Sequence, residues 1–337
     1  MGSRKYIVTG GGGFVGKALC KSLRLEGHHV ISISRGHYPE LAELGVTCVR
    51  ADLGEGYEGW CSVFEGVDGV FHTAAKVDMW GKREAFVQAN VIATRNVVAA
   101  CKAYKVPSLV FTSSPSVVHT GRDLINVNES IPRATHFSAF YPETKAIAEQ
   151  EVLSAANEAL RVTALRPHLI WGPNDTNLIP AVLTRARAGA LKRVGDGSNV
   201  VDLTFISDCV NAHLCAMRTL ESAPERCSGK AYFISQGDPV PLWRWIDDIL
   251  TVHGLPKVKS SVSLPLALKV AAVCETLSRI LLRFGIIYPP RFSSFLVTEM
   301  ATSHYFDISA AKRDLGYSPS CSIAEAMEKT FGVAGVQ

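Results

Sequence analysis

Long hydrophobic runs are absent from this chain, because no stretch stays apolar over the ~18–20 residues that a membrane-spanning helix needs. The nearest approach is Leu264–Ile287, which is interrupted by Lys269, Glu275, Arg279 and Arg283. A transmembrane segment is therefore not expected. The interrupted pattern predicts an amphipathic helix that packs on the core or lies over an apolar substrate pocket, where it could meet a membrane surface or a partner enzyme.

Paired cysteines are also absent. The nine cysteines are scattered and form no CxxC pair, so neither a metal site nor a disulfide framework is predicted. Their odd number and the lack of a signal peptide indicate reduced thiols and a cytoplasmic protein. Charge of one sign is scarce: the net charge is +4, and no run of Lys and Arg is interleaved with aromatic residues, so nucleic acid is not an expected partner.

Glycine, in contrast, is concentrated near the N-terminus. Tyr6–Thr9 reads as a short buried strand, and an apolar helix is expected over Lys17–Glu26. Between them the glycines are spaced GxxGxxG, at Gly10, Gly13 and Gly16. Glycines at such a junction let the backbone approach a pyrophosphate, which the N–H groups of the helix start can bind. This segment therefore predicts a dinucleotide site.

Strand-like and helix-like segments alternate through the first half of the chain. Strands are expected at Tyr6–Thr9, His29–Ile33, Thr47–Arg50, Gly69–Thr73, Ser108–Ser113 and Val162–Leu169. Helices are expected at Lys17–Glu26, Trp60–Phe64, Lys82–Tyr104 and Tyr141–Leu160. Strands separated by helices predict an α/β fold with a Rossmann-like, doubly wound parallel sheet.

The alternation loosens after Gly172-Pro173 and returns briefly at Val200–His213 and Lys230–Ser235. We therefore predict two domains. A Rossmann domain would comprise residues 1–175 and about 200–235. A smaller, discontinuous α/β substrate-binding lobe would comprise about 176–199 and 236–337.

Tyr141 and Lys145 are four residues apart, which places both side chains on one face of a helix. Free tyrosine has a pKa of ~10, and a nearby lysine favours its anion, so this pair can exchange a proton with a substrate oxygen. Upstream, Ser113 and Ser114 end a predicted strand. A hydroxyl at the C-terminal edge of a parallel sheet faces the ligand crevice and can hydrogen-bond a carbonyl, although serines there also cap turns.

Together these motifs resemble the extended short-chain dehydrogenases/reductases. The resemblance is carried by Gly10/Gly13/Gly16, Asp52-Leu53, His72-Thr73-Ala74-Ala75, Asn90–Thr94, Ser113-Ser114, Tyr141/Lys145, Leu165-Arg166-Pro167 and Gly172-Pro173. It implies a catalytic set of Tyr141 as acid/base, Lys145 as its partner and Ser114 as the group that polarises the carbonyl. It also implies cofactor contacts from Gly10, Gly13, Phe14, Val15, Gly16, Arg35, Asp52, Leu53, Ala74, Ala75, Ser113, Tyr141, Lys145, Pro167 and Ile170.

The second strand ends in Ser34-Arg35-Gly36, with no acidic residue to hold a ribose 2′-hydroxyl. A guanidinium suits phosphate oxygens, so Arg35 favours NADP as the cofactor, with NAD as the alternative.

Within this group the chain is most similar to the 3β-hydroxysteroid dehydrogenase branch, and there to bacterial 2-alkyl-3-oxoalkanoate reductases of long-chain olefin biosynthesis. Residues 113–118, 164–173 and 229–235 carry the likeness to the branch, while 34–39, 75–81 and 194–199 carry the likeness to the reductases. The implied reaction is NADPH-dependent reduction of a 2-alkyl-3-oxo fatty acid. A carboxylate on such a substrate could meet a basic residue: Arg185, Arg187, Lys192 or Arg193.

Three other functions stay open at this point. They are a 3β-hydroxysteroid or sterol-4-carboxylate 3-dehydrogenase, a nucleotide-sugar epimerase, and an NADP-sensing regulator without turnover. Intact Ser114, Tyr141 and Lys145 argue against the regulator, and the apolar segment near residue 264 argues against a very polar substrate. The resemblance also implies a homodimer, paired through the helices at Lys82–Tyr104 and Tyr141–Leu160.

Overall fold

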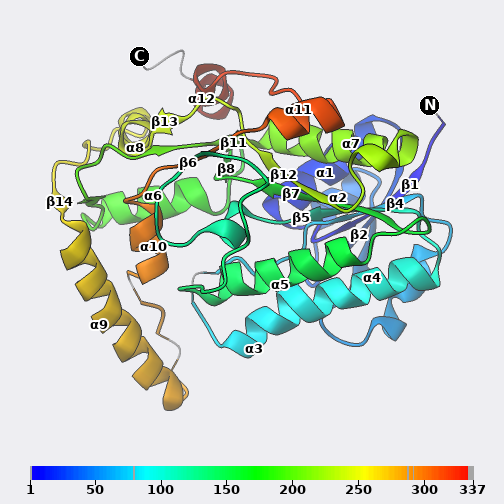
Figure 1. Ribbon diagram of the computed structural model, residues 1–337, viewed down its shortest axis with the longest axis horizontal. Coiled ribbons are helices and arrows are strands. Elements are labelled where there is room, and N and C mark those ends of the chain that lie inside the picture. Colours follow the sequence, from blue (N-terminus) through cyan, green and yellow to red (C-terminus); the bar gives the residue numbers. More distant parts are fainter. Residues whose placement is uncertain (1, 79, 287, 291, 333–337) are drawn as a thin grey trace.

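The computed structural model describes residues 2–78, 80–286, 288–290 and 292–332. Its centre is a seven-stranded sheet in the order β12-β7-β5-β4-β1-β2-β3, with parallel pairing at every interface (Figure 1). The strands are β1 (Lys5–Thr9), β2 (His29–Ser34), β3 (Thr47–Arg50), β4 (Gly69–His72), β5 (Ser108–Thr112), β7 (Arg161–Pro167) and β12 (Lys230–Ile234). This confirms the predicted doubly wound parallel sheet.

The middle residues of the central strands are apolar and buried, as expected where helices cover both faces of the sheet. Ile7 and Val8 in β1 and Val70 and Phe71 in β4 are all fully buried. The register aligns Thr9 with both Ile33 and His72, so the strands end along one edge. The crevice outside this edge is where ligands bind in folds of this kind.

One face of the sheet is covered by α1 (Phe14–Leu25) and α7 (Ile206–Ser222), and the other by α4 (Ala93–Ala103) and α5 (Phe140–Ser154) (Figure 1). In α1 the buried residues Gly16, Leu19, Cys20 and Leu23 follow the three- and four-residue spacing of one helix face. α2 (Pro39–Glu43) lies beyond β2, and single turns occur at Tyr57–Gly59, Cys61–Phe64, Pro115–Val118 (η4) and Pro224–Arg226.

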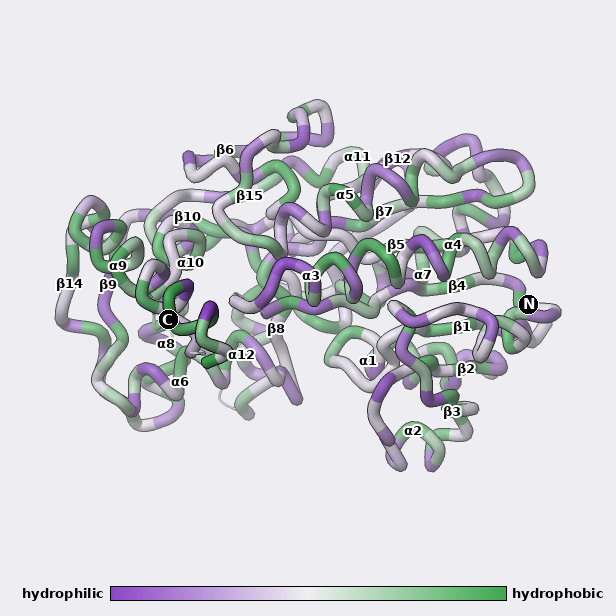
Figure 2. The backbone as a smooth tube through the Cα atoms, turned by 90° about the horizontal axis from the view of Figure 1, so that it is seen from below, coloured by the Kyte–Doolittle hydropathy of each residue, from purple (hydrophilic) through white to green (hydrophobic). Residues whose placement is uncertain are grey.

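The rest of the chain forms a lobe with its own apolar core, at the end of the molecule away from the N-terminus (Figure 2). Its strands form a four-stranded sheet, β13-β10-β15-β6, and two short pairs, β11-β8 and β14-β9. They are β6 (Leu124–Val127), β8 (Ile170–Trp171), β9 (Arg193–Val194), β10 (Val200–Val201), β11 (Thr204–Phe205), β13 (Val240–Pro241), β14 (Ser261–Val262) and β15 (His304–Phe306). Its helices are α6 (Leu178–Arg187), α8 (Leu242–Val252), α9 (Leu264–Arg283), α10 (Ser294–Glu299) and α12 (Ile323–Phe331). α11 (Ser309–Leu315) packs instead on α7 and β12, beside the main sheet.

The expected return of residues 200–213 to the main sheet is wrong for Val200–Val201. These residues form β10, which pairs with β13 and β15 in the four-stranded sheet, and only α7 comes back to pack on the main sheet. Two adjacent valines pair equally well at either place, so the local sequence does not distinguish the two sheets. The return of Lys230–Ile234 is confirmed, because β12 pairs with β7 along its length.

Three predicted helices differ in detail. The segment Lys82–Tyr104 is α3 (Arg83–Phe86), a π-helical turn at Val87–Ile92 and then α4. The helix from Tyr141 ends at Ser154, because the Asn157 side chain accepts the N–H groups of Ala159 and Leu160 and holds the chain in a turn. The segment Trp60–Phe64 forms only 3₁₀ turns.

α9 is a single 20-residue helix that projects from the lobe (gold in Figure 1). No helix within the described ranges is both long and apolar enough to cross a membrane. Ile287, the last residue of the predicted segment 264–287, lies outside the described residues, as do Met79 and residues 333–337. The predicted division into domains at residues 176–199 and 236–337 stays a prediction.

Candidate active site

The glycine loop is shaped by close backbone contacts. Gly10 has φ +69°, and a Cβ atom there would lie 2.8 Å from the Cα of Ala74. A Cβ on Gly16 would collide with the carbonyl oxygen of Gly10. The N–H of Gly13, the residue that precedes α1, bonds that same oxygen at 2.8 Å. The chain therefore turns tightly into α1, and the first N–H groups of the helix are left for a ligand.

A cavity of about 200 Å³ lies over this loop. It brings together seven of the residues expected to contact the cofactor: Gly10, Gly13, Arg35, Asp52, Leu53, Ala74 and Ala75. Phe14, Val15 and Gly16 follow directly in the first turn of α1. The backbone cradle and the mixed polar and apolar lining fit the adenosine and pyrophosphate of a dinucleotide.

Tyr38 also lines this cavity, and sequence reasoning missed it. Its ring lies so close to Gly12 and Gly36 that a side chain at either position would meet it. Lys17 lies 5.9 Å from the centre of the ring. Gly12 and Gly36 could have indicated a large side chain nearby, but their closeness to Tyr38 depends on how β2 and α1 pack and is not visible in the sequence.

Arg35 is positioned at the outer rim of the cavity. Its side chain is 72% exposed, and the guanidinium lies 3.9 Å from Asp52 Oδ2. A contact of this length at the surface contributes little, so Arg35 is free to turn toward a negatively charged ligand.

The predicted catalytic pair lies on the inner face of α5, where Pro142 is tolerated because the first turn has unpaired N–H groups. Lys145 is buried; its Nζ donates to the carbonyl oxygen of Thr112 at 2.6 Å and lies 4.0 Å from the centre of the Phe111 ring. Burial lowers the pKa of Lys145 to about 7, and the charge of Glu149 opposes the shift. This lysine can therefore change charge near neutral pH.

The pKa of Tyr141 is raised in the free protein, contrary to the expectation that the neighbouring Lys145 favours its anion. Burial raises the pKa of its phenol, the hydroxyl of Ser114 opposes this by hydrogen bonding, and the negative charge of Glu299 adds to the rise. The phenol is therefore protonated in the free protein at neutral pH. A protonated tyrosine is the form needed to donate a proton to a carbonyl oxygen during reduction.

The two adjacent serines are used differently. Ser114 lies beside Tyr141, and its Oγ also accepts the N–H of Ser116 at 3.2 Å, which caps the short helix η4. Ser113 is buried, and its hydroxyl donates to Glu149 Oε2 at 2.6 Å. The structure thus brings Ser114, Tyr141 and Lys145 together, whereas Ser113 is directed to the packing between α5 and the sheet.

Glu149 is the centre of a buried ion pair that sequence reasoning did not single out. It accepts two hydrogen bonds from Arg166, at 2.8 and 2.6 Å, and one from Arg133 at 3.2 Å. Burial alone would raise the pKa of Glu149, but the bonds and charge of Arg166 outweigh this and hold the pKa below its usual range. Glu149 follows Lys145 by one helical turn, so this pair fixes the catalytic face of α5 against β5 and β7.

The π-helical turn is anchored by Asn90. Its side chain donates to Thr144 Oγ1 at 2.9 Å and exchanges hydrogen bonds with both backbone groups of Lys76. Thr144 immediately precedes Lys145, so Asn90 joins α5 to the loop that follows β4. Such π-helical turns are frequent at functional sites.

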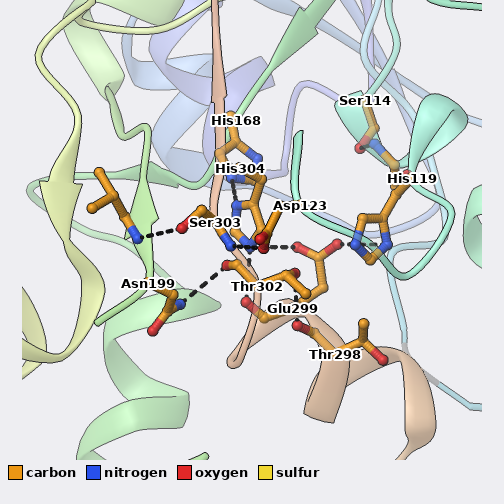
Figure 3. Close-up of polar contacts among 12 residues, drawn as sticks. Ser114, His119, Asp123, His168, Asn199, Thr298, Glu299, Thr302, Ser303 and His304 are labelled. Carbon is orange, nitrogen blue, oxygen red and sulfur yellow. Dashed lines mark hydrogen bonds and ion pairs between the residues drawn. The ribbon is translucent and has the colours of Figure 1, made fainter. Parts of the chain in front are cut away.

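Pro167 ends β7 and Ile170 begins β8, both at the C-terminal edge of the sheet. Between them lies His168, which belongs to a polar cluster with His119, Glu299 and His304 (Figure 3). Sequence reasoning missed this cluster, because its members come from four separate segments.

The basic residues expected to meet a carboxylate are spread through the lobe. Arg193 forms an ion pair with Asp247 at 2.7 Å. Arg185 is partly buried, and burial lowers its pKa. Arg187 and Lys192 are exposed.

Comparison with known proteins identifies the family. The sequence model of the 3-beta hydroxysteroid dehydrogenase/isomerase family matches residues 7–266. The chain belongs to this family. Among curated relatives, a 2-alkyl-3-oxoalkanoate reductase of Stenotrophomonas maltophilia is 43% identical, over 96% of this chain and 98% of the relative. A 2-alkyl-3-oxoalkanoate reductase of Shewanella oneidensis is 45% identical, over 96% and 84%.

A human sterol-4-alpha-carboxylate 3-dehydrogenase is 33% identical, over 97% of this chain and 87% of the relative. Among solved structures, MoeE5 in complex with UDP-glucose and NAD superposes with a TM-score of 0.72 at 22% identity, over 97% of both chains. That likeness shows the fold. The family and its relatives make this protein an NAD(P)-dependent oxidoreductase that acts on a CH–OH group, as predicted.

Proposed function

We propose that the protein uses NADPH to reduce the 3-oxo group of a 2-alkyl-3-oxo fatty acid. The observation that carries this proposal is the placement of Ser114 and a protonated Tyr141 together at the sheet edge that also holds the glycine-loop cavity. Two curated relatives at 43% and 45% identity bear the name 2-alkyl-3-oxoalkanoate reductase, which supports the choice of substrate.

The residues supply the polar half of the reaction. The Ser114 hydroxyl donates a hydrogen bond to the ketone oxygen, and Tyr141 transfers its proton to that oxygen. Lys145, one turn along α5, stabilises the tyrosinate that results until a proton from water restores it. A reduced nicotinamide, when bound, supplies the hydride to the ketone carbon. The product is a 2-alkyl-3-hydroxy acid.

The preference for NADPH rests on Arg35. Its exposed guanidinium stands at the rim of the cavity, where the 2′-phosphate of an adenosine would reach it. Asp52 is the acidic residue nearest to Arg35 there, and no acidic side chain ends β2 at the position that would hold a free ribose 2′-hydroxyl.

We also propose that the protein is a homodimer paired through α4 and α5. A groove lies between these helices, lined by the small and apolar residues Val98, Ala99, Ile147 and Ala155 and by charged residues that include Arg95, Lys102 and Glu151. Small and apolar residues at such positions let two helix pairs pack closely. Light scattering should give about twice the chain mass of 36.4 kDa, and a monomer would contradict the pairing.

We also propose that the outer face of α9 contacts the membrane surface or the partner enzyme from which the lipid-like substrate comes. Leu266, Val270, Val273, Leu277 and Ile280 recur every three or four residues and are 43–60% exposed. Such a stripe suits contact with a membrane surface or a partner enzyme. Co-sedimentation with vesicles separates these two: binding that is lost in the variant Val273→Ser/Leu277→Ser supports lipid contact, and absence of binding leaves the partner enzyme.

The proposed reaction is tested with purified protein, NADPH and a 2-alkyl-3-oxo acid. NADPH should be consumed in proportion to substrate, and mass spectrometry should identify the 2-alkyl-3-hydroxy acid as product. No turnover of the acid, together with oxidation of a 3β-hydroxysterol by NAD, would instead support the sterol dehydrogenase activity named for relatives at 32–33% identity.

A further inference from the structure

His119 carries a buried nitrogen that the site described so far does not use. Its side chain is 4% exposed, its Nδ1 lies 3.2 Å from Glu299 Oε1, and its Nε2 finds no hydrogen-bond partner among the described residues. A carboxylate only accepts hydrogen bonds, so Nδ1 carries a hydrogen and Nε2 is the free atom. Buried polar atoms without a partner are rare in folded proteins and call for an explanation such as a ligand.

The Glu299 carboxylate is held from its other side by His304. The Nε2 of His304 lies 3.6 Å from Glu299 Oε2 and donates to the backbone carbonyl of the same residue at 2.8 Å. Its Nδ1 is 2.6 Å from His168 Nε2. His168, Glu299 and His304 each offer one atom that could bind a metal ion, and these atoms lie within 4.8 Å of one another. However, His304 uses Nδ1 toward His168 and Nε2 toward Glu299, on opposite edges of its ring. These residues therefore form a hydrogen-bonded chain that ends at His119 (Figure 3).

This chain ends next to the catalytic groups. His119 directly follows η4, the single 3₁₀ turn that begins after Ser114. At about 2 Å per residue, such a turn places the two Cα atoms roughly 10 Å apart or less. Figure 3 labels Ser114 and His119 on this same segment, with the Glu299 carboxylate joined to His119 by a dashed line. The negative charge of Glu299 also acts on the Tyr141 phenol. Glu299 therefore couples the His119 end of the chain electrostatically to the proposed acid/base.

We propose that His119, oriented by Glu299, binds the carboxylate of the 3-oxo acid through Nε2 and so selects acids over neutral ketones. This inference rests on the proposed function. In a 3-oxo acid one carbon separates the carboxylate from the ketone carbon. When Ser114 and Tyr141 hold the ketone oxygen, the carboxylate must therefore meet a side chain close to these two residues. His119 supplies that group from the same segment as Ser114.

Binding through Nε2 takes up a proton. Burial lowers the pKa of His119 in the free protein, while Glu299 opposes the shift and His304 adds to it. His119 is thus neutral at neutral pH, and a carboxylate needs a hydrogen on Nε2. When the acid binds, one proton from solvent converts His119 to an imidazolium between two carboxylates, that of Glu299 and that of the substrate. The titratable groups that act on His119 are Glu299 from α10 and His304 from β15, with His168 behind His304.

The first experiment compares a 2-alkyl-3-oxo acid with its methyl ester in the wild-type protein between pH 6.5 and 8.5. For the acid, KM should rise with pH by up to about tenfold per unit, because the proton becomes costlier to take up. For the ester, KM should stay level. Parallel pH profiles for acid and ester would overturn the proposal, and reduction of neither compound would instead remove the proposed function beneath it.

The second experiment uses His119→Gln, with His253→Gln as the matched control. His253 is a partly buried histidine at the end of α8 whose Nδ1 bonds the Ile249 carbonyl. A hydrogen bond to a charged group predicts that His119→Gln raises KM for the acid about ten- to a hundredfold, with kcat for the ester unchanged. The control should leave both unchanged. Equal losses for acid and ester would show that His119 only supports the fold.

Glu299→Gln provides a test that keeps the imidazole. Without the carboxylate the imidazolium is harder to form, so the pH range over which KM for the acid rises should move to lower pH. An unchanged profile would contradict the role given to Glu299. Thermal unfolding of each variant shows whether a loss of activity comes from loss of the folded state.

Discussion

At the glycine-loop end of the sheet the backbone leaves no room for side chains, whereas in the lobe large side chains fill the space. A Cβ on Gly10 or Gly16 would meet backbone atoms of Ala74 or Gly10. In the lobe, Trp171, Trp243 and Trp245 are buried together, and their indole nitrogens have no partner among the described residues. In the proposed function, cofactor binding therefore depends on the course of the main chain, and substrate recognition depends on side chains from distant segments.

This difference explains why one fold serves many substrates. Backbone geometry that fits a dinucleotide tolerates few changes, and it is set by a short continuous segment. Side chains that line a substrate pocket can be replaced one at a time without disturbing the sheet. Between the two ends lie Ser114, Tyr141 and Lys145, which we propose act on both the cofactor and the substrate.

The largest effect is expected when the proposed proton donor, Tyr141, is removed, because it lies between the cofactor region and the substrate region. Tyr141→Phe should lower kcat by on the order of 10²–10⁴-fold, because the ketone oxygen loses its acid. NADPH affinity, measured by fluorescence titration, should stay close to that of the wild type. Activity that survives the change would mean that another group donates the proton.

Glu149→Gln tests how much the buried Glu149–Arg166 ion pair stabilises the protein. Breaking a buried ion pair leaves Arg166 without its partner, and we expect a loss of about 3–5 kcal/mol in the free energy of unfolding. Since the folded-state pKa of Glu149 is lowered, its contribution is present above the ordinary carboxyl pKa of 4.5 and is lost as pH falls through the lower folded value.

Thermal unfolding at several pH values measures this. The difference in Tm between wild type and Glu149→Gln should be large at pH 7 and should shrink below pH 4.5. A constant difference over that range would show that the ion pair does not govern the effect. Glu328→Gln, the same substitution at an exposed position of α12, is the control and should change Tm little.

Gly16→Ala tests whether the glycine loop has room for a side chain. The added methyl group collides with the Gly10 carbonyl, so the loop must shift at a cost of about 1–3 kcal/mol. Cofactor affinity should fall, and the turnover of any remaining complex should change less. Gly59→Ala, where a Cβ meets nothing within 4 Å, should bind the cofactor as the wild type does.

The smallest expected effect concerns Arg35. Arg35→Ala should raise KM for NADPH about tenfold through loss of one charge-assisted hydrogen bond, and should leave KM for NADH nearly unchanged. Steady-state kinetics with both cofactors measures this. Equal changes for NADPH and NADH would leave Arg35 as a surface residue and would favour NAD.

Much of the fold followed from local patterns. The seven strands of the main sheet lie close to their expected ranges because most of them are short apolar runs bounded by turn residues. The two valines of β10 were placed in the wrong sheet, because pairing partners are chosen by packing and not by two residues. The break of Lys82–Tyr104 by a π-helical turn depends on the bonds of Asn90 to Thr144, which no helical periodicity reveals.

The candidate site divides in the same way. Gly10, Gly13 and Gly16, and the pair Tyr141/Lys145, are recognisable because their spacing within one segment carries the chemistry. The Glu149–Arg166 pair and the chain from His168 to His119 join residues far apart in sequence, so only the three-dimensional structure shows them. Ser113 and Ser114 looked alike in the sequence, and the structure directs their hydroxyls to different partners.

The most direct test of the account is a competition between two substrates in one reaction. In the forward direction, purified protein is given NADPH and a 2-alkyl-3-oxo acid. In the reverse direction, it is given NADP or NAD with a mixture of a 2-alkyl-3-hydroxy acid and a 3β-hydroxysterol, which compete for the site. We predict that the acyclic acids turn over with the higher kcat/KM and that NADP(H) is preferred. Turnover of the sterol alone, with NAD, would contradict the proposed substrate and the role of Arg35.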